Sequence, residues 1–264
     1  RAVSVIIVLI FHFWQQTWIF PVIKTPWLAF VGITKIDFSN FATVGYLFVD
    51  MMVLISGFLL FLPLMRSIIL GEEMSSWKNY ARRRIARIVP SYYFAVLLLF
   101  FASALPTGAY ATTADALKDL FAHLTFTQTL WVNTYIATPL DVVLWTVAIE
   151  VWFYVLFPFV AEFIKGPRNK NRQSFTPAYG IFFIFAVFNI INYVYIENFV
   201  LKGDVYLAMR INQFPAFLGV YSIGMLGASA FVLIAKNCRR SRIFNAVNTL
   251  FSVCSILLIV YLIN

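Results

Sequence analysis

The sequence predicts an all-α membrane protein, built as one polytopic bundle of transmembrane helices. The chain has 264 residues, of which 62% are hydrophobic and only 12% are charged. Soluble domains typically contain about 45–50% apolar and about 25% charged residues. The apolar residues also come in runs of about 20, the length at which a helix crosses a bilayer. These runs exclude an ordinary soluble fold, whose core would have no room for them.

The apolar runs set the expected number of helices. Seven runs are long enough to be spans, and the last is expected to be incomplete. They cover residues 2–23, 41–65, 88–105, 140–164, 179–196, 214–235 and 245–264. Because the chain starts at Arg1 without Met and stops inside an apolar run, we expect a fragment. It would be a single transmembrane domain over 1–264, with C-terminal spans missing.

The positive charges lie mostly on one side of the predicted membrane. With these spans, 15 of the 20 Lys and Arg residues fall at the N-terminus or in loops 66–87, 165–178 and 236–244. Loops rich in Lys and Arg stay in the cytoplasm during insertion. We therefore expect a cytoplasmic N-terminus and a bacterial inner-membrane location. Spread over short loops, the net charge of +9 does not indicate a nucleic-acid partner.

The longest outer segment, 106–139, carries an apolar stripe. Leu117, Leu120, Phe121 and Leu124 recur in it at helical spacing. Such a stripe predicts an amphipathic helix that lies along the outer membrane surface.

Other polar residues give weaker signals. Asp141 and Glu162 lie near the ends of the fourth predicted span and are interpreted as interfacial. His123 is interpreted as a surface or packing residue. Cys238 and Cys254 are not spaced as metal ligands or as a disulfide framework, so no metal site is expected.

Three ionisable residues fall inside predicted spans. His12 lies ten residues into the first span, Asp50 nine into the second and Glu150 ten into the fourth. At about 1.5 Å per residue, all three are expected about 15 Å deep, near the midplane. Ionisable groups are costly there and tend to be functional. One interpretation is a histidine base with carboxylate partners. The other is a structural polar cluster that holds helices together.

Basic residues at the inner ends of two helices form a second pattern. Arg1 precedes His12 by 11 residues, nearly three turns, so the two share a helical face. Arg84 and Arg87 share a face at the inner end of the third span. Paired guanidinium groups suit a phosphate-rich ligand. The alternatives are a positive-inside flank for Arg1, and a flank that also binds anionic lipid headgroups for the other two.

Four segments resemble, in order, signature blocks of acyltransferase family 3. These are integral membrane enzymes that acylate cell-envelope sugars and antibiotics. The blocks are Arg1 with His12, Gly45–Asp50 with Leu54–Leu59, Arg83–Tyr93, and Leu144–Glu150 with Phe153, Tyr154 and Pro158. The rest of the chain, 159–264, resembles the family only in hydropathy. One departure is Val151 after Glu150, where the family often has a second glutamate.

The resemblance also implies roles for individual residues. His12 would be the general base with Arg1 beside it, and Glu150 and Asp50 would support this centre. The donor site would be cytoplasmic: Arg84 and Arg87 would bind the phosphates of acyl-CoA, with Arg83 and Tyr92 of the same block nearby.

The expected function is transfer of an acyl group, with acetyl as the family's common case, from acyl-CoA to a hydroxyl of a cell-envelope carbohydrate or a lipid-linked sugar. Acyl-CoA would be a substrate, and no permanently bound cofactor is implied. An alcohol is a poor nucleophile at neutral pH, so a base must take its proton. Two alternatives remain. A proton-coupled transporter or flippase would use His12, Asp50 and Glu150 as a proton relay, and a membrane scaffold would not depend on His12.

Overall fold

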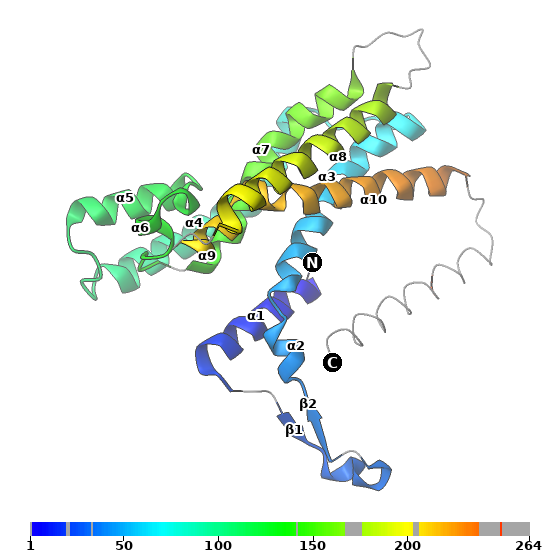
Figure 1. The fold of residues 1–264 in the computed structure, drawn as a ribbon. Coiled ribbons are helices and arrows are strands. Elements are labelled where there is room, and N and C mark those ends of the chain that lie inside the picture. The colour runs from blue at the N-terminus through cyan, green and yellow to red at the C-terminus, as the bar shows by residue number, and fades with distance from the viewer. Residues whose placement is uncertain are drawn as a thin grey trace. The chain divides into compact units, whose positions relative to one another are not determined.

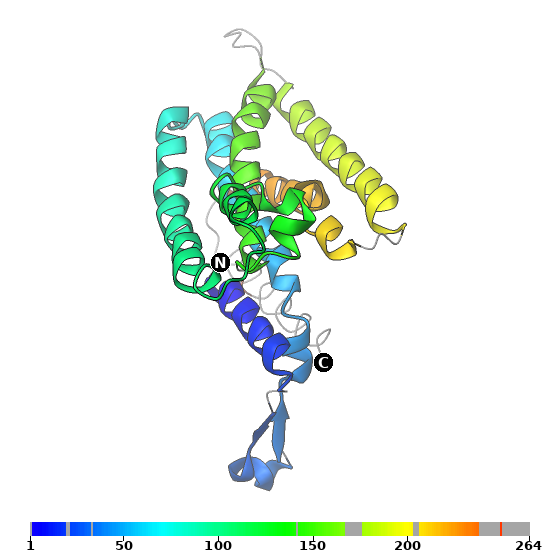
Figure 2. The same ribbon diagram turned by 90° about the vertical axis from the view of Figure 1, so that its left-hand side faces the viewer.

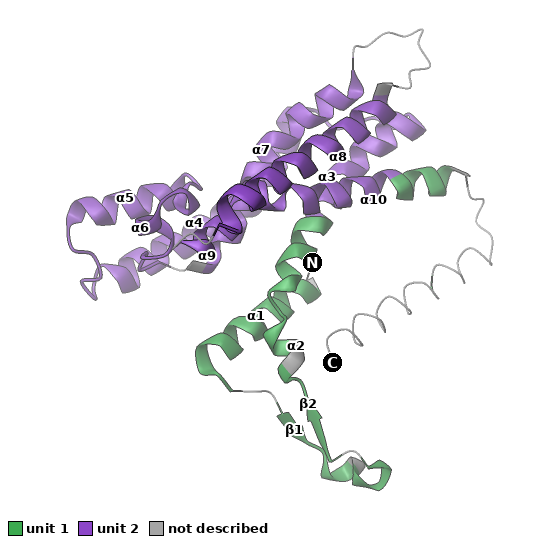
Figure 3. Ribbon diagram, viewed as in Figure 1, with its two compact units in different colours: residues 1–55, 230–264 green, residues 56–229 purple. Residues whose placement is uncertain are grey.

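The computed structural model describes residues 2–19, 22–32, 34–140, 142–166, 176–202, 206–237 and 249. The chain divides into two compact units (Figure 3). Unit 1 contains residues 1–55 and 230–264, and unit 2 contains residues 56–229. Arg1, both cysteines, Asp141 and the predicted span 245–264 lie outside the described residues.

The described residues form helices, with one short two-stranded hairpin (Figure 1). Five segments are long and apolar enough to cross a membrane: Leu47–Leu70, Trp77–Ala104, Trp145–Lys165, Pro177–Val200 and Phe214–Lys236. The chain is thus an integral membrane protein by its helices, as predicted. The predicted count of about seven spans is not confirmed.

The first predicted span is shorter in the structure. Helix α1 runs over Ala2–Thr17 and is followed by strands β1 (Val22–Lys24) and β2 (Lys35–Asp37), which pair antiparallel. Trp18 takes a left-handed backbone conformation, with a φ of 54°, directly after the helix. The predicted limit at residue 23 was therefore wrong, because hydropathy does not distinguish helix from an apolar strand.

In unit 1, helix α1 packs against the short helix α2 (Ser39–Thr43) and the turn that follows it. A β-carbon at Gly45 would overlap the β-carbon of Phe11, so the backbone at this glycine lies against the α1 side chain. The Phe11 ring also meets the Tyr46 ring edge-on, with centroids 6.0 Å apart. Helix α3 (Leu47–Leu70) begins directly after this turn.

The third span starts earlier than predicted. Helix α4 covers Trp77–Leu99 and continues as a π-helical turn, Phe100–Ala104. Ser76 caps it by accepting a hydrogen bond from the Asn79 backbone N–H at 3.4 Å, as serine commonly does at helix starts. Only residues 71–76 separate α3 from α4, so the arginine cluster lies in the helix and not in a loop. Long Arg side chains tolerate this because their charged ends reach toward water.

In unit 2, α4 runs antiparallel to α7 (Trp145–Lys165). Trp77 at the start of α4 donates to Glu162 Oε1 near the end of α7, at 2.8 Å. Later in α4, Tyr92 shares a buried cluster with Ala148 from the start of α7. Figure 2 shows α7 between α4 and α8 (Thr176–Tyr195). Helix α8 continues as the π-helical segment Ile196–Val200.

Helix α10 (Leu218–Asn237), preceded by the 3₁₀ turn Phe214–Phe217, packs closely on α3 and α7. A β-carbon at Gly57 of α3 would lie 2.5 Å from the Tyr221 carbonyl oxygen, so the two backbones are in direct contact there. The Tyr221 ring stacks on Phe153 of α7, with centroids 3.6 Å apart. Small residues at helix crossings commonly permit such contact in membrane proteins.

The segment between α4 and α7 forms a cap outside the candidate spans. It contains α5 (Thr113–Leu124), a 3₁₀ turn (Gln128–Leu130), α6 (Val132–Tyr135) and a second 3₁₀ turn (Val142–Leu144). The predicted amphipathic helix is therefore present. Leu120 and Leu124 pack on the core formed with α4, whereas Leu117 and Phe121 are exposed. A short helix, α9 (Leu207–Ile211), lies between α8 and α10.

Candidate functional site

His12 lies in α1, five residues before the helix ends at Thr17. Its ring is half-exposed, meets Phe11 edge-on at 5.2 Å, and places Nδ1 3.2 Å from Gln15 Oε1. Arg1 lies outside the described residues, so its predicted place beside His12 stays a prediction.

Asp50 lies in the first turn of α3, because that helix starts at Leu47. The sequence placed it nine residues into a span, so its predicted depth was wrong. His12 and Asp50 belong to unit 1 and Glu150 to unit 2. Their predicted common site therefore stays a prediction.

Glu150, in the second turn of α7, is the centre of a polar cluster within unit 2. Its Oε1 accepts a hydrogen bond from Ser56 Oγ at 2.7 Å, and its Oε2 accepts one from the Tyr154 hydroxyl at 2.9 Å. The carboxylate is half-buried among apolar helices, where a polar group is stable only when it is hydrogen-bonded. Ser56 comes from α3, so the cluster also joins two spans.

Arg84 continues this cluster toward the start of α4. Its guanidinium carbon lies 5.1 Å from the centre of the Tyr154 ring and 5.5 Å from that of Tyr80. The Tyr80 hydroxyl donates to the Tyr154 carbonyl oxygen at 3.2 Å, which fixes the two rings around the cation. Cation–π contacts of this kind are worth about 0.5–2 kcal/mol. Tyr154 thus links Arg84 to Glu150, with its ring facing one and its hydroxyl bonded to the other.

The other arginines of the cluster, Arg82, Arg83 and Arg87, have exposed side chains. In the described part of the chain, no carboxylate pairs with any of them or with Arg84. Nearby acidic residues are committed elsewhere: Glu72 pairs with Arg66 at 2.8 Å, and Glu162 pairs with Lys165 at 3.0 Å. The four guanidinium groups therefore form a cationic surface that an anion can neutralise.

Tyr92 is 4% exposed and takes part in the packing of the cap. Its hydroxyl donates to the His123 carbonyl oxygen at 3.1 Å and accepts from Gln128 Nε2 at 3.0 Å. Tyr93 donates to the Leu124 carbonyl oxygen at 2.7 Å. The last carbonyl groups of a helix lack partners within the helix, and this tyrosine pair supplies them for α5. These contacts give Tyr92 a structural role, and the donor contact suggested by the resemblance stays untested.

A buried carboxylate in the cap was not anticipated from the sequence. Asp119 is 2% exposed, and its Oδ2 accepts hydrogen bonds from the Tyr110 hydroxyl at 2.8 Å and from Thr138 Oγ1 at 2.7 Å. Its Oδ1 lies 3.2 Å from Nδ1 of His123, which is also buried. The available signal was the i, i+4 spacing of Asp119 and His123 in a predicted helix, where His123 had been interpreted as a surface or packing residue.

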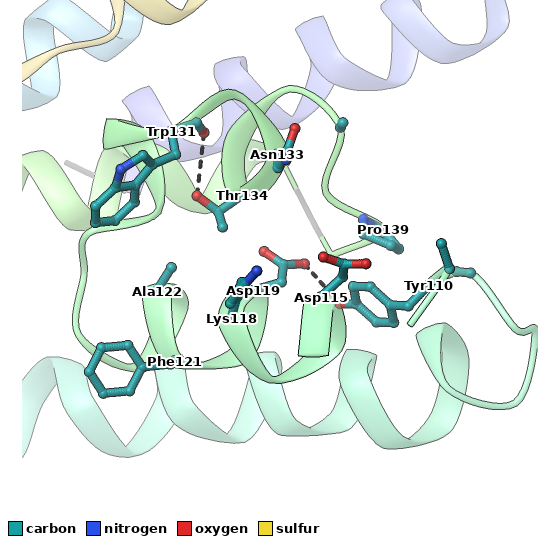
Figure 4. Close-up of a pocket in the computed structure, with 13 residues that line it drawn as sticks. Tyr110, Asp115, Lys118, Asp119, Phe121, Ala122, Trp131, Asn133, Thr134 and Pro139 are labelled. Carbon is teal, nitrogen blue, oxygen red and sulfur yellow. Dashed lines mark hydrogen bonds between the residues drawn. The ribbon is translucent and has the colours of Figure 1, made fainter. Parts of the chain in front are cut away.

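A pocket of about 550 Å³ opens beside Asp119, between α5 and the segment that contains α6 (Figure 4). Its polar lining includes Asp115, Lys118 and Asn133, and its aromatic lining includes Trp131 and Phe121. Among the described residues, no group of three His, Cys, Asp or Glu side chains is placed to hold a metal ion.

Taken together, the apolar helices, the buried polar cluster around Glu150 and the cationic surface at one end of α4 define an integral membrane protein with a polar site among its spans. A comparison with family models adds the chemistry. The chain belongs to acyltransferase family 3, because the model described as an acyltransferase domain matches residues 1–264. It is therefore a membrane O-acyltransferase by family. No curated protein and no solved structure matches the chain in the corresponding searches.

Proposed function

We propose that this protein transfers an acyl group from acyl-CoA, bound at the arginine cluster, to a hydroxyl of a cell-envelope carbohydrate. The observation that carries the proposal is Arg84, held between Tyr80 and Tyr154 with no carboxylate paired to it in the described residues. A guanidinium fixed in this way retains its charge and its donors for a phosphate group.

The donor would enter from the cytoplasm. Arg84 lies seven residues after Trp77, so it is about 10 Å along α4 from the end that the charge distribution places inside. Glu150 is one helical turn from Tyr154, on the side of α7 closer to the cap. A donor whose phosphates contact Arg84 would thus extend its acyl end toward the polar cluster of Glu150.

In the transfer step, His12 would take the proton of the acceptor hydroxyl while its oxygen attacks the thioester carbonyl. The new C–O bond forms, the C–S bond breaks, and the thiolate leaves and takes up the proton. Ser56 and Tyr154 would hold the Glu150 carboxylate in place. No covalent acyl-enzyme is required, so Cys and Ser side chains have no nucleophilic role in this scheme.

The test uses the protein with radiolabelled acyl-CoA and a carbohydrate acceptor, following both thioester loss and ester formation. Arg84→Ala removes a charge-assisted contact worth about 1.5–3 kcal/mol, so the donor KM should rise about tenfold or more. Lys78→Ala, which removes an exposed cation of α4 outside the arginine cluster, is the matched control and should leave the donor KM unchanged. Substrate movement without thioester loss would instead favour a transporter, and an unchanged donor KM in Arg84→Ala would refute the donor site.

The proposed orientation has its own measurement. Glu73 and Thr113 are both exposed, and they lie beyond opposite ends of α4. Glu73 is in the 71–76 loop before the helix, and Thr113 is at the start of α5 after it. In intact cells, a membrane-impermeant thiol reagent should label Thr113→Cys and leave Glu73→Cys unlabelled until the membrane is opened. The reverse pattern would overturn the cytoplasmic position of the arginine cluster.

A further inference from the structure

The pocket in the cap lies in a segment that none of the five candidate spans includes. It follows the C-terminal end of α4, whereas the arginine cluster lies near the N-terminal end of the same helix. Because α4 crosses the membrane, the pocket and the cluster face opposite compartments. A ligand of this pocket would therefore approach from the side away from the proposed donor.

The walls of the pocket are fixed by Asp119. Tyr110 lies in the segment before α5, Asp119 in α5 and Thr138 in the segment after α6. The Tyr110 and Thr138 hydroxyl groups both donate to Oδ2 of Asp119, which joins the three segments. In Figure 4, Tyr110 and Pro139 lie at one end of the pocket and Trp131 at the other. A site whose walls are joined in this way needs little reorganisation when a ligand binds.

The free surface of the pocket combines an aromatic face with polar groups. Trp131 is 54% exposed, which leaves much of the indole surface open. Lys118 and Asn133 are exposed and make no side-chain hydrogen bond among the described residues. Asp115 uses one carboxylate oxygen to accept from Thr112 at 2.6 Å, as part of the cap of α5, and the other is without such a bond in the described chain. Hydrogen-bond donors and acceptors are thus available around the flat, apolar surface of the Trp131 ring.

This combination selects among ligand classes. An acyl chain would need a wholly apolar channel, and a phosphate would need an excess of cations, but Asp115 and Asp119 outnumber Lys118 here. A sugar ring fits both features, because its C–H face packs on an aromatic ring and its hydroxyls bond to amide, carboxylate and ammonium groups. The volume of about 550 Å³ lies within the range of small-molecule sites.

We propose that the pocket between α5 and α6 binds the carbohydrate acceptor, by stacking on Trp131 and hydrogen bonding to Asn133, Lys118 and Asp115. The assignment of the bound sugar as the acceptor rests on the proposed function. The same ring chemistry is present in a free oligosaccharide and in a lipid-linked sugar, so the shared recognition is of an uncharged, hydroxyl-rich ring.

The test measures binding and turnover separately on the whole protein. The probes are a free N-acetylglucosamine trisaccharide, the same trisaccharide on an alkyl chain, and glucose 6-phosphate as a charged comparison. The variants are Asn133→Ala and Trp131→Ala, with Leu130→Ala as control because Leu130 is an exposed neighbour outside the pocket lining. We expect calorimetric binding of at least one trisaccharide probe, weakened about fivefold or more by each pocket variant and unchanged by Leu130→Ala.

In turnover, the pocket variants should raise the acceptor KM and leave the donor KM unchanged. Preference for the alkyl-linked probe would identify a lipid-linked source, and equal binding would identify the sugar alone. Binding that depends on Asn133, in a protein that transfers no acyl group, would support the pocket and refute the proposed function. Transfer with an unchanged acceptor KM in both pocket variants, or no binding of either trisaccharide, would overturn the pocket assignment and leave the donor site standing.

Discussion

The arginine cluster and the cap pocket, both in unit 2, hold their charged side chains in different ways. At the arginine cluster, Arg84 is stabilised by the faces of Tyr80 and Tyr154, and its charge is left for a ligand. In the cap, Oδ2 of Asp119 accepts hydrogen bonds from the Tyr110 and Thr138 hydroxyl groups, and Oδ1 lies 3.2 Å from His123 Nδ1. A cation held by aromatic rings can still bind an anion, whereas a carboxylate oxygen that accepts from two hydroxyl groups holds the segments around it together. The first arrangement suits an anionic donor and the second a neutral acceptor.

The largest expected effect tests the base that the proposed reaction between a donor at the arginine cluster and an acceptor from the cap needs. His12→Ala should reduce acyl transfer by about 10²–10⁴-fold, the usual contribution of a general base. His12→Gln keeps a hydrogen bond but no useful basicity, so it should be nearly as damaging. Donor binding, measured alongside turnover, should be unchanged in both variants. Near-normal transfer by a well-folded His12→Ala protein would rule out His12 as the base.

The next effect tests the aromatic support of the cation. Arg84→Lys keeps the charge but loses the planar group that stacks on Tyr154 and Tyr80, so donor affinity should fall by about tenfold. Arg87→Lys, at an exposed position where the described residues provide no aromatic ring for stacking, should lose much less. Donor titration of the two variants provides the comparison. Equal losses would show that charge alone, and not the stacked geometry, binds the donor.

A smaller effect is expected from the carboxylate that fixes the cap. Asp119→Asn keeps the shape of the side chain but weakens the acceptor of two hydroxyl groups, which typically costs about 1–3 kcal/mol. Thermal unfolding in detergent should show a lower Tm, and sugar binding should weaken with it. Glu73→Gln is the control, since Glu73 is exposed and lies outside both this buried network and the pocket lining. An unchanged Tm in Asp119→Asn would show that the pocket walls are held by packing instead.

The smallest effect concerns the Tyr110 hydroxyl. Burial, then its hydrogen bond to Asp119, raises the pKa of Tyr110 above its usual value. The neutral hydroxyl therefore contributes stability that is fully present below the usual tyrosine pKa of about 10. That stability is lost only as the pH rises through the higher folded-state pKa. The 295 nm absorbance difference between the wild type and Tyr110→Phe should show this group titrating late, and ionisation near pH 10 would contradict the contact.

Much of the fold and part of the site were predictable from the sequence. Glu150 and the arginine cluster stand out because charge is rare in apolar runs, and the family blocks mark the same residues. Ser56 and Tyr154 were quoted in those blocks without a role, because hydroxyl groups are ordinary in membrane helices and only their partners reveal them. Tyr154 lies one turn from Glu150 in the same helix, whereas Ser56 lies 94 residues upstream and reaches Glu150 only because α3 packs on α7.

The errors have equally local causes. The start of α4 was placed too late because arginines lower the average hydropathy, whereas the Ser76 cap sets the real boundary. Asp119 was missed because the stripe of Leu117 and Phe121 identified only the apolar face of α5. Its other face is covered by Tyr110 and Thr138, which come from segments outside the helix. Hydropathy reports where a helix is apolar, but not which polar side chains fold over each other.

The contact between Gly57 and Tyr221 has a mechanical consequence. Because the α3 and α10 backbones touch, α3 cannot rotate about its axis or slide along α10 without a clash. Over this stretch the two helices therefore form one rigid pair. Ser56 lies next to Gly57 in the chain. Phe153, next to Tyr154, stacks on Tyr221. We therefore expect this backbone contact to hold Ser56 in place beside the Glu150 carboxylate.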